Sequence, residues 1–282
     1  MPLDPAKLAA FAVPEIRQGW TRRDTSFYAL SIGLGADPLD ERQLAYVDPT
    51  ADLRTIPTMA LVIAHPGFWL ADPRSGVDPA SALHAEQEVE ILAPLPCEGR
   101  FVSRTEVSGL VDKGPGRAAL LATDTTITDE ATGRAVAIGR RLTFLKGQGG
   151  FGGSADAAPP PRAIPSEPPD HVVDLPTRPE QALFYALNGD DNPLHTRPAA
   201  ARAAGFPRPI LHGLCTMGVV AHALARSLAD YDASRIARLR IRFTAPVHAG
   251  ETVRTEVWHD GAFRARVVER DLVVGDGRVA LA

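Results

Sequence analysis

The second half of the chain shows two patterns of hydrophobic and polar residues. From Leu211 to Ala229 apolar residues occur on every side, with few charges before Arg226, and such a stretch is typical of a buried helix. Residues 238–243 then alternate arginine with apolar side chains, which indicates a strand with one buried and one solvated face. Three further strands are expected at 251–258, 262–270 and 272–281, with turns at 260–261 and 275–277.

A similar series of elements is predicted in the first half. Its strands are expected near 87–93, 100–111, 117–128 and 134–145, with breaks at 113–116 and 132–133. The counterpart of the buried helix, Thr58 to Trp69, meets Pro66 and Gly67 after about two turns, and these residues stop a helix. We therefore expect a truncated central helix in the first half, with space above its sheet for a long apolar ligand.

Short segments recur in the same order in both halves, at a spacing of about 150 to 160 residues. The pairs are Phe27–Leu30 with Phe184–Leu187, Thr58–Met59 with Thr216–Met217, and Arg104–Val107 with Arg254–Val257. Ordered matches at nearly one spacing indicate a duplicated domain rather than chance. Each copy is predicted to be an α+β unit, an antiparallel sheet curved around a central helix, with the two sheets joined side by side.

Glycine and proline are concentrated between the two copies. Residues 147–153 are rich in glycine, and proline runs follow at 159–161 and 168–169, a composition that disfavours both helix and central strand. We therefore predict an N-terminal repeat over residues 1–146, an extended linker over 147–172 and a C-terminal repeat over 173–282.

Composition and charge exclude several classes of protein. The 282 residues are 45% hydrophobic and 23% charged, which is typical of a soluble globular protein. The net charge of −4 gives no electrostatic reason to expect a nucleic-acid or membrane partner. Cys97 and Cys215 suggest neither a disulfide framework nor a metal cluster. The N-terminus lacks the pattern of a secretory signal, so a cytoplasmic location is expected.

The densest group of potentially catalytic residues is the segment 188–195. Its asparagines, glycine and proline predict a turn, on which Asp190 and His195 can converge. Adding water to an activated alkene needs one group that deprotonates the water and one that protonates the neighbouring carbon, and this pair supplies both. An ordinary structural loop would have the same composition. Comparison of the two copies favours a catalytic role for the second, because the first has Asp40 where His195 would fall. A loop needed only for folding is expected to be the same in both copies.

The segment Tyr185–His195, with Ala201, resembles the hydratase 2 motif of the MaoC-like (R)-specific enoyl-CoA hydratases. The resemblance covers nearly the whole chain and is closest to the two-domain form, similar to the hydratase unit of the peroxisomal multifunctional enzymes of type 2. Further matching segments are 204–206, 209–216, 243–246 and Gly250 in the second half, and 23–25, 28–30, 84–87 and 149–153 in the first. The sequence departs from the family at Asn188, where a small residue such as Ser is usual, so the pocket wall is expected to differ.

The resemblance implies a double hotdog fold and hydration of trans-2-enoyl-CoA to (3R)-3-hydroxyacyl-CoA, or the reverse dehydration, without a cofactor or metal. It assigns Asp190 and His195 as the catalytic dyad, with Asn192 in support and the backbone N–H of Gly213 polarising the thioester carbonyl. The Gly213 role also fits the physics, because helix N-termini offer free N–H groups to a developing enolate. The residues expected at the substrate are Gly189, His212, Arg242, placed to meet a CoA phosphate, and Glu86, as a contact or a structural partner near the site. A homodimer is expected as well.

Two other functions stay open from the sequence. A hotdog acyl-CoA thioesterase would share the fold and the recognition of CoA but would hydrolyse the thioester. A non-catalytic acyl-CoA-binding partner subunit would lack the dyad, and the presence of both Asp190 and His195 argues against it. The division of acid and base roles within the dyad also stays open, because a sequence gives no pKa.

Overall fold

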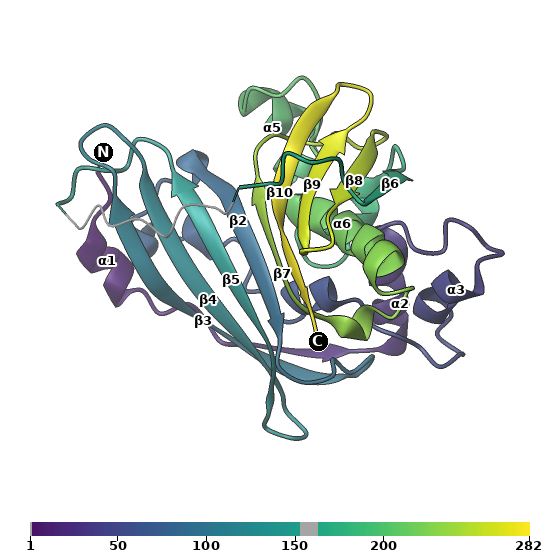
Figure 1. Cartoon of the computed structure of the whole chain (residues 1–282). Helices are drawn as coiled ribbons and strands as arrows, with labels where there is room; N and C mark the ends of the chain where they lie inside the picture. The colour runs from purple at the N-terminus through teal and green to yellow at the C-terminus, as the bar shows by residue number, and fades with distance from the viewer. Residues whose placement is uncertain (1, 153–162) are drawn as a thin grey trace.

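A computed structural model describes residues 2–152 and 163–282 of the chain. In these ranges ten strands form a single antiparallel sheet, in the order β1-β3-β4-β5-β2-β7-β10-β9-β8-β6. The strands are β1 (Ile16–Trp20), β2 (Ala82–Ile91), β3 (Gly99–Asp112), β4 (Ala119–Asp129), β5 (Ala135–Leu145), β6 (His171–Pro176), β7 (Ile236–Phe243), β8 (Thr252–Val257), β9 (Ala262–Val267) and β10 (Leu272–Leu281). Figure 1 shows the blue and teal strands of the first half beside the green and yellow strands of the second, as the predicted pair of joined sheets requires.

The helices are short, with one exception. The α-helices are α1 (Pro5–Ala10), α2 (Arg22–Ser31), α3 (Glu41–Val47), α4 (Gln181–Ala186), α5 (Pro198–Ala203) and α6 (Gly213–Leu228), and the 3-10 helices are η1 (Pro57–Leu61), η2 (Trp69–Ala71), η3 (Pro73–Ser75), η4 (Pro79–Ser81), η5 (Pro193–His195) and η6 (Ala233–Arg235). The exception, α6, lies in the curve of the second half (Figure 1) and packs against β6, β7 and β8.

The buried central helix predicted in the second half is confirmed as α6. Every residue from Leu214 to Ala225 is buried, so the helix has no solvated face over most of its length. A side chain at Gly218 would overlap Ile32, which follows α2 of the first half. The two halves therefore share one large hydrophobic core around α6. A second, smaller cluster lies in the first half and includes Leu8, Leu70 and Leu121.

The central helix of the first half is truncated, as predicted, and it is shorter than expected. Instead of two α-helical turns it is the 3-10 helix η1, which packs against α6. The chain leaves η1 through Ala64, whose φ is +51°, and reaches Pro66 and Gly67, which cannot continue a helix. The segment after η1 forms only short 3-10 helices, and its Leu70 and Val77 are buried in a small cluster with residues of β4 and β5.

The two halves are joined where β2 pairs with β7. On the inner face Val89 lies opposite Leu239, and both are fully buried. On the outer face the side chain of Arg240 forms an ion pair with Glu86, which confirms that the arginines of this strand lie on the solvated side. Burial of each large apolar side chain contributes about 2 kcal/mol, whereas a half-exposed ion pair contributes less than about 1 kcal/mol. The inner face therefore holds the halves together.

Two boundaries predicted from the sequence are wrong. Residues 275–277 form no turn; they lie inside β10, and the turn from β9 occurs at 268–271, where Asp271 takes a φ of +47°. The predicted linker ends too late, because β6 begins at His171 and pairs with β8. Of the rest of the linker, 153–162 lies outside the described residues, Gly153 of the family motif included.

Glycine at position 277 allows β10 to pair closely with β7. A Cβ atom there would overlap the carbonyl oxygen of Arg240 and approach the ring of Phe263 to 2.6 Å. We expect Gly277→Ala to lower the free energy of unfolding by about 3 kcal/mol, because a crowded β-strand must shift its backbone. Gly19→Ala is the control: this strand glycine has no atom within 4 Å of a Cβ position, so its midpoint in urea should be nearly unchanged. Equal midpoints for both variants would contradict the explanation.

Candidate active site

The loop that carries the predicted dyad follows α4 and is fixed from both ends. Gly189 has a φ of +104°, a conformation that favours glycine. Beyond it, the side chain of Asn192 accepts a hydrogen bond of 3.1 Å from the backbone N–H of Leu194 and caps η5. Behind the loop, the buried Asn188 donates to Ser31 Oγ at 2.9 Å. Asn188 is not among the residues that line the cavity; it ties the loop to α2.

The structure brings Asp190 and His195 together. The Asp190 carboxylate, His195 and His212 each present an atom within 4.8 Å of the other two. Nδ1 of His195 lies 2.9 Å from the carbonyl oxygen of Ile210 and donates to it in the neutral ring. Nε2 of His195 is therefore left unprotonated, and it is the nitrogen that is able to accept a proton.

His212 lies beneath this pair and is fully buried at the start of α6. Its Nε2 donates to the backbone carbonyl of Asp190 at 3.1 Å, and its ring lies on that of His195, with 3.9 Å between the centroids. His212 does not line the cavity, although the sequence predicts it as a substrate contact. Its ring contacts the two residues of the dyad and, on another side, the buried ring of Tyr185.

The charges of the dyad follow from this environment. Burial lowers the pKa of His195, although the Ile210 carbonyl and the Asp190 charge oppose the decrease. Burial and the neighbouring His195 lower the pKa of His212 to about 4. Burial favours the protonated form of Asp190, but the surrounding histidines outweigh it and lower the pKa of its carboxyl group. At neutral pH the site therefore holds a carboxylate beside two neutral imidazoles.

The dyad faces a cavity of about 470 Å³, and the first residues of α6 also line this cavity. Gly213 is the first residue of this helix, so its N–H has no acceptor within the helix. Gly189, Asp190, Asn192, His195 and Gly213 all line the cavity, which brings together five of the eight residues predicted for the site.

The other two predicted substrate contacts, Glu86 and Arg242, do not line this cavity. Glu86 forms an ion pair with Arg240, and Arg242 forms one with Asp276 at 3.1 Å, both on the outer face of the sheet. The expected contact of Arg242 with a CoA phosphate stays a prediction, as does the place of Glu86 near the substrate.

The first half contributes three polar residues to the cavity that the sequence analysis did not assign to the site: His65, His84 and Arg141. Burial lowers the pKa of both histidines, and the nearby Arg141 charge lowers it further. Arg141 had a signal in the sequence, because Arg140 and Arg141 are adjacent in a strand and must point to opposite faces. One of the two therefore had to face the interior.

Asp190, His195 and His212 also form the one group in the described part of the chain that lies close enough to hold a metal ion. Each histidine already uses one ring nitrogen on a backbone carbonyl, which leaves His195 Nε2 and His212 Nδ1 available. The sequence contains no metal-ligand motif at this spacing, which is why a site without metal is predicted. That expectation stays a prediction.

Both halves of the chain match known families. Residues 19–147 match the MFE-2 hydratase 2 N-terminal domain, and residues 162–278 match the MaoC like domain. The 3-hydroxyacyl-thioester dehydratase Y of Mycobacterium tuberculosis is 39% identical over 99% of this chain and 98% of its own length. The peroxisomal enoyl-CoA hydratase 2 of Arabidopsis thaliana is 36% identical over 96% and 93%.

Among solved structures, a MaoC-like dehydratase from Phytophthora capsici is 30% identical and superposes with a TM-score of 0.83, covering 99% of this chain and 98% of that one. The shared fold and the near-complete coverage agree with the resemblance seen in the sequence. On these matches the chain belongs to the MaoC-like hydratase 2 family, in its two-domain form.

Proposed function

We propose that this protein hydrates trans-2-enoyl-CoA thioesters to (3R)-3-hydroxyacyl-CoA, or catalyses the reverse dehydration. The observation that carries the proposal is the arrangement of a carboxylate, Asp190, a neutral imidazole, His195, and a free helix N–H, Gly213, around one cavity. Relatives named as an enoyl-CoA hydratase and as a 3-hydroxyacyl-thioester dehydratase support the same reaction in its two directions.

The proposed mechanism adds one water and needs no co-reactant. Nε2 of His195 takes a proton from the water as the water oxygen forms a bond to C3. The electrons of the C2=C3 bond move to the thioester carbonyl, whose negative charge the N–H of Gly213 stabilises. The imidazolium passes its proton to the ionised Asp190, and Asp190 delivers it to C2, which restores both groups.

Three further residues are proposed to position this pair. Gly189 provides the left-handed turn that brings Asp190 to the cavity, and Asn192 caps the short helix that carries His195. His212 holds the Asp190 backbone and the ring of His195 in place. Because its pKa of about 4 keeps it neutral, it adds no positive charge that would hinder protonation of His195.

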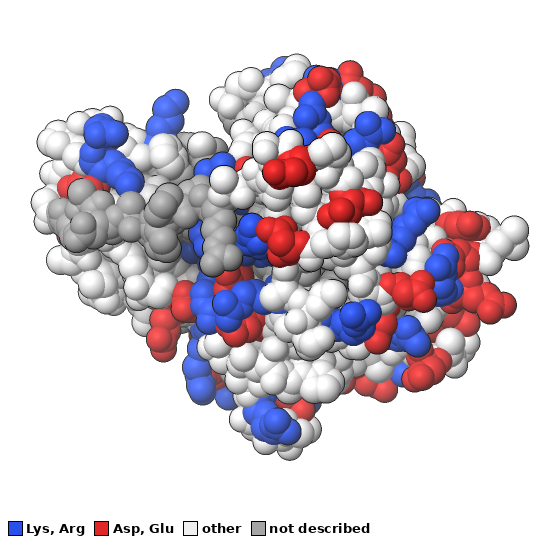
Figure 2. Space-filling view, in the orientation of Figure 1, with Lys and Arg blue, Asp and Glu red and all other residues white. Residues whose placement is uncertain are grey.

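The surface of the protein bears on its partners and location. No helix in the described part of the chain has the length and hydrophobicity to cross a bilayer. Figure 2 shows acidic and basic side chains interspersed over the visible face, as expected of a protein without a nucleic-acid surface there. We propose an acyl-CoA thioester as the partner molecule. The homodimer and the cytoplasmic location stay predictions.

The dyad is tested by substitution. We expect Asp190→Asn and His195→Gln to lower kcat/KM for crotonyl-CoA about a thousandfold, since each removes a proton-transfer group. Asp191→Asn is the matched control, with the same change of charge one residue along the loop, and it should keep most of the activity. Wild-type rates for folded dyad variants would disprove the assignment. Release of free CoA thiol would identify a thioesterase instead, and an inactive wild-type chain would favour the partner-subunit alternative.

The pH dependence tests the charge states. His195 must be neutral to accept a proton, and its pKa lies below 6.5, so kcat/KM should stay constant down to pH 6.5 and decrease only below it. In Asp190→Asn the His195 pKa should decrease further, because the carboxylate that stabilises the imidazolium is lost. NMR titration of the imidazole nitrogens measures this shift without activity. The mechanism would be contradicted if kcat/KM began to decrease already above pH 6.5 as the pH is lowered. It would also be contradicted by a higher His195 pKa in the variant.

A further inference from the structure

A second, smaller cavity of about 50 Å³ adjoins the main one on the side of the first half. The two cavities share His65, Gly67, Arg141 and Leu214 as lining residues. The small cavity lies on the inner face of the sheet, where apolar residues are usual, but several polar residues line it. We call it the polar recess. The strand residues that give it this character are Gln87, Thr105, Thr123, Thr125 and Arg141.

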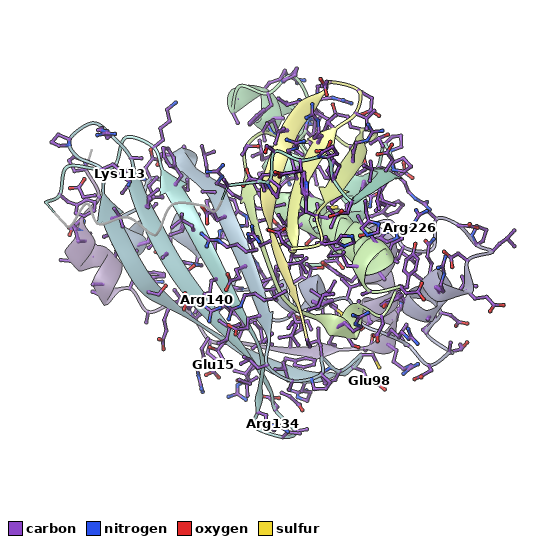
Figure 3. All side chains as sticks on the ribbon, in the orientation of Figure 1. Glu15, Glu98, Lys113, Arg134, Arg140 and Arg226 are labelled. Atoms are coloured by element: carbon purple, nitrogen blue, oxygen red, sulfur yellow. The ribbon has the colours of Figure 1, made fainter. Side chains whose placement is uncertain are left out.

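Arg141 is a cation without a partner in the described part of the chain. Its Nε atom is shielded from solvent and makes no hydrogen bond, and no carboxylate lies within ion-pair distance of its guanidinium. Arg140, the preceding residue, shows the contrast: it reaches Glu88 and Glu90, each at 2.7 Å, on the opposite face of β5. Figure 3 labels this outer arginine. Arg141 is partly buried, and the charge of Asp190 acts on it without forming an ion pair. A guanidinium that faces a cavity without a directly paired carboxylate indicates a ligand that completes it.

The position of Arg141 relative to the dyad indicates which part of a ligand reaches it. Asp190, His195 and Arg141 line the same main cavity, whose lining also includes apolar side chains such as Phe144 and Leu214. Arg141 and Asp190 are close enough for their charges to interact. If C2 and C3 of an enoyl thioester lie at the dyad, an acyl tail that extends through the cavity toward the first half reaches Arg141.

We infer that the preferred substrate is an enoyl-CoA whose acyl tail ends in a carboxylate, and that Arg141 binds this carboxylate. The inference rests on the proposed function and specifies its substrate class. A planar guanidinium pairs with a carboxylate through two parallel hydrogen bonds, a geometry that few other groups match. The hydroxyl groups of the recess, such as Thr123, offer donors to the remaining carboxylate lone pairs. A methyl-ended tail of the same length would shield the cation from water without offering it a hydrogen bond or an opposite charge.

The inference is tested with pairs of trans-2-enoyl-CoA substrates of equal length, one ending in methyl and one in carboxylate, over a series of short to medium lengths. At one length or more, kcat/KM should favour the carboxylate by about tenfold or more, the effect of a charged hydrogen-bonded pair. Arg141→Met should abolish the preference, and Arg141→Lys should keep part of it, because the charge remains but the fork is lost. Arg140→Met, on the outer face, should leave the preference unchanged.

Calorimetric binding of the saturated ω-carboxyacyl-CoA and acyl-CoA analogues supplies a readout that does not depend on turnover. The wild-type protein should bind the carboxylate analogue more tightly, and Arg141→Met should not. Equal affinity and equal kcat/KM within every pair would overturn the inference. So would an equal loss for both members of a pair in Arg141→Met, since Arg141 would then bind a part common to both, such as CoA. If analogues bind with this preference but no enoyl-CoA is hydrated, the proposed function fails and the carboxylate site stands.

Discussion

The antiparallel pairing of β2 with β7 is the contact on which the rest of the structure depends. It makes one sheet of two halves, and it fixes the first half at a set distance from the loop of the second. The catalytic loop supplies Asp190 and His195, while the opposite wall comes from strands of the first half. Neither half encloses the cavity alone. The apolar inner face, with Val89 against Leu239, therefore determines the shape of the site as well as the stability of the fold.

The duplicated halves have diverged into different roles around this contact. The second half kept a full central helix, and the first residue of that helix, Gly213, faces the cavity. The first half reduced the equivalent helix to η1, and its sheet is left to line the cavity and the polar recess. In the proposed function the reacting groups thus come from one copy, and the other copy contributes much of the remaining cavity wall. Space for an apolar tail above the first sheet stays a prediction, and the small cavity in this half also carries polar residues, Arg141 among them.

Elements with strong periodicity could be predicted from the sequence, and those that depend on distant partners could not. The all-round hydrophobic stretch of α6 and the alternating strands carry their signal locally. The short edge strands β1 and β6 carry little, and both were missed. Gly277 was interpreted as part of a turn. The reason for glycine there is the close approach of β7, which is distant in the sequence and therefore not visible from the neighbouring residues. The comparison of the copies singled out Asp190 and His195, which the structure brings together, whereas the direction of Arg141 required the strand register.

The hydrogen bond from Asn188 to Ser31 has a consequence for how the duplication can evolve further. It anchors the catalytic loop of one copy to a helix of the other, in the interior and at the level of single atoms. Gln181, which begins α4, makes a second such bond to the Ser31 carbonyl. Loss or exchange of the first copy would leave buried donors without acceptors directly behind the reacting groups. Changes in the two copies are therefore coupled at this contact: a substitution at Ser31 calls for a compensating change at Asn188 or Gln181.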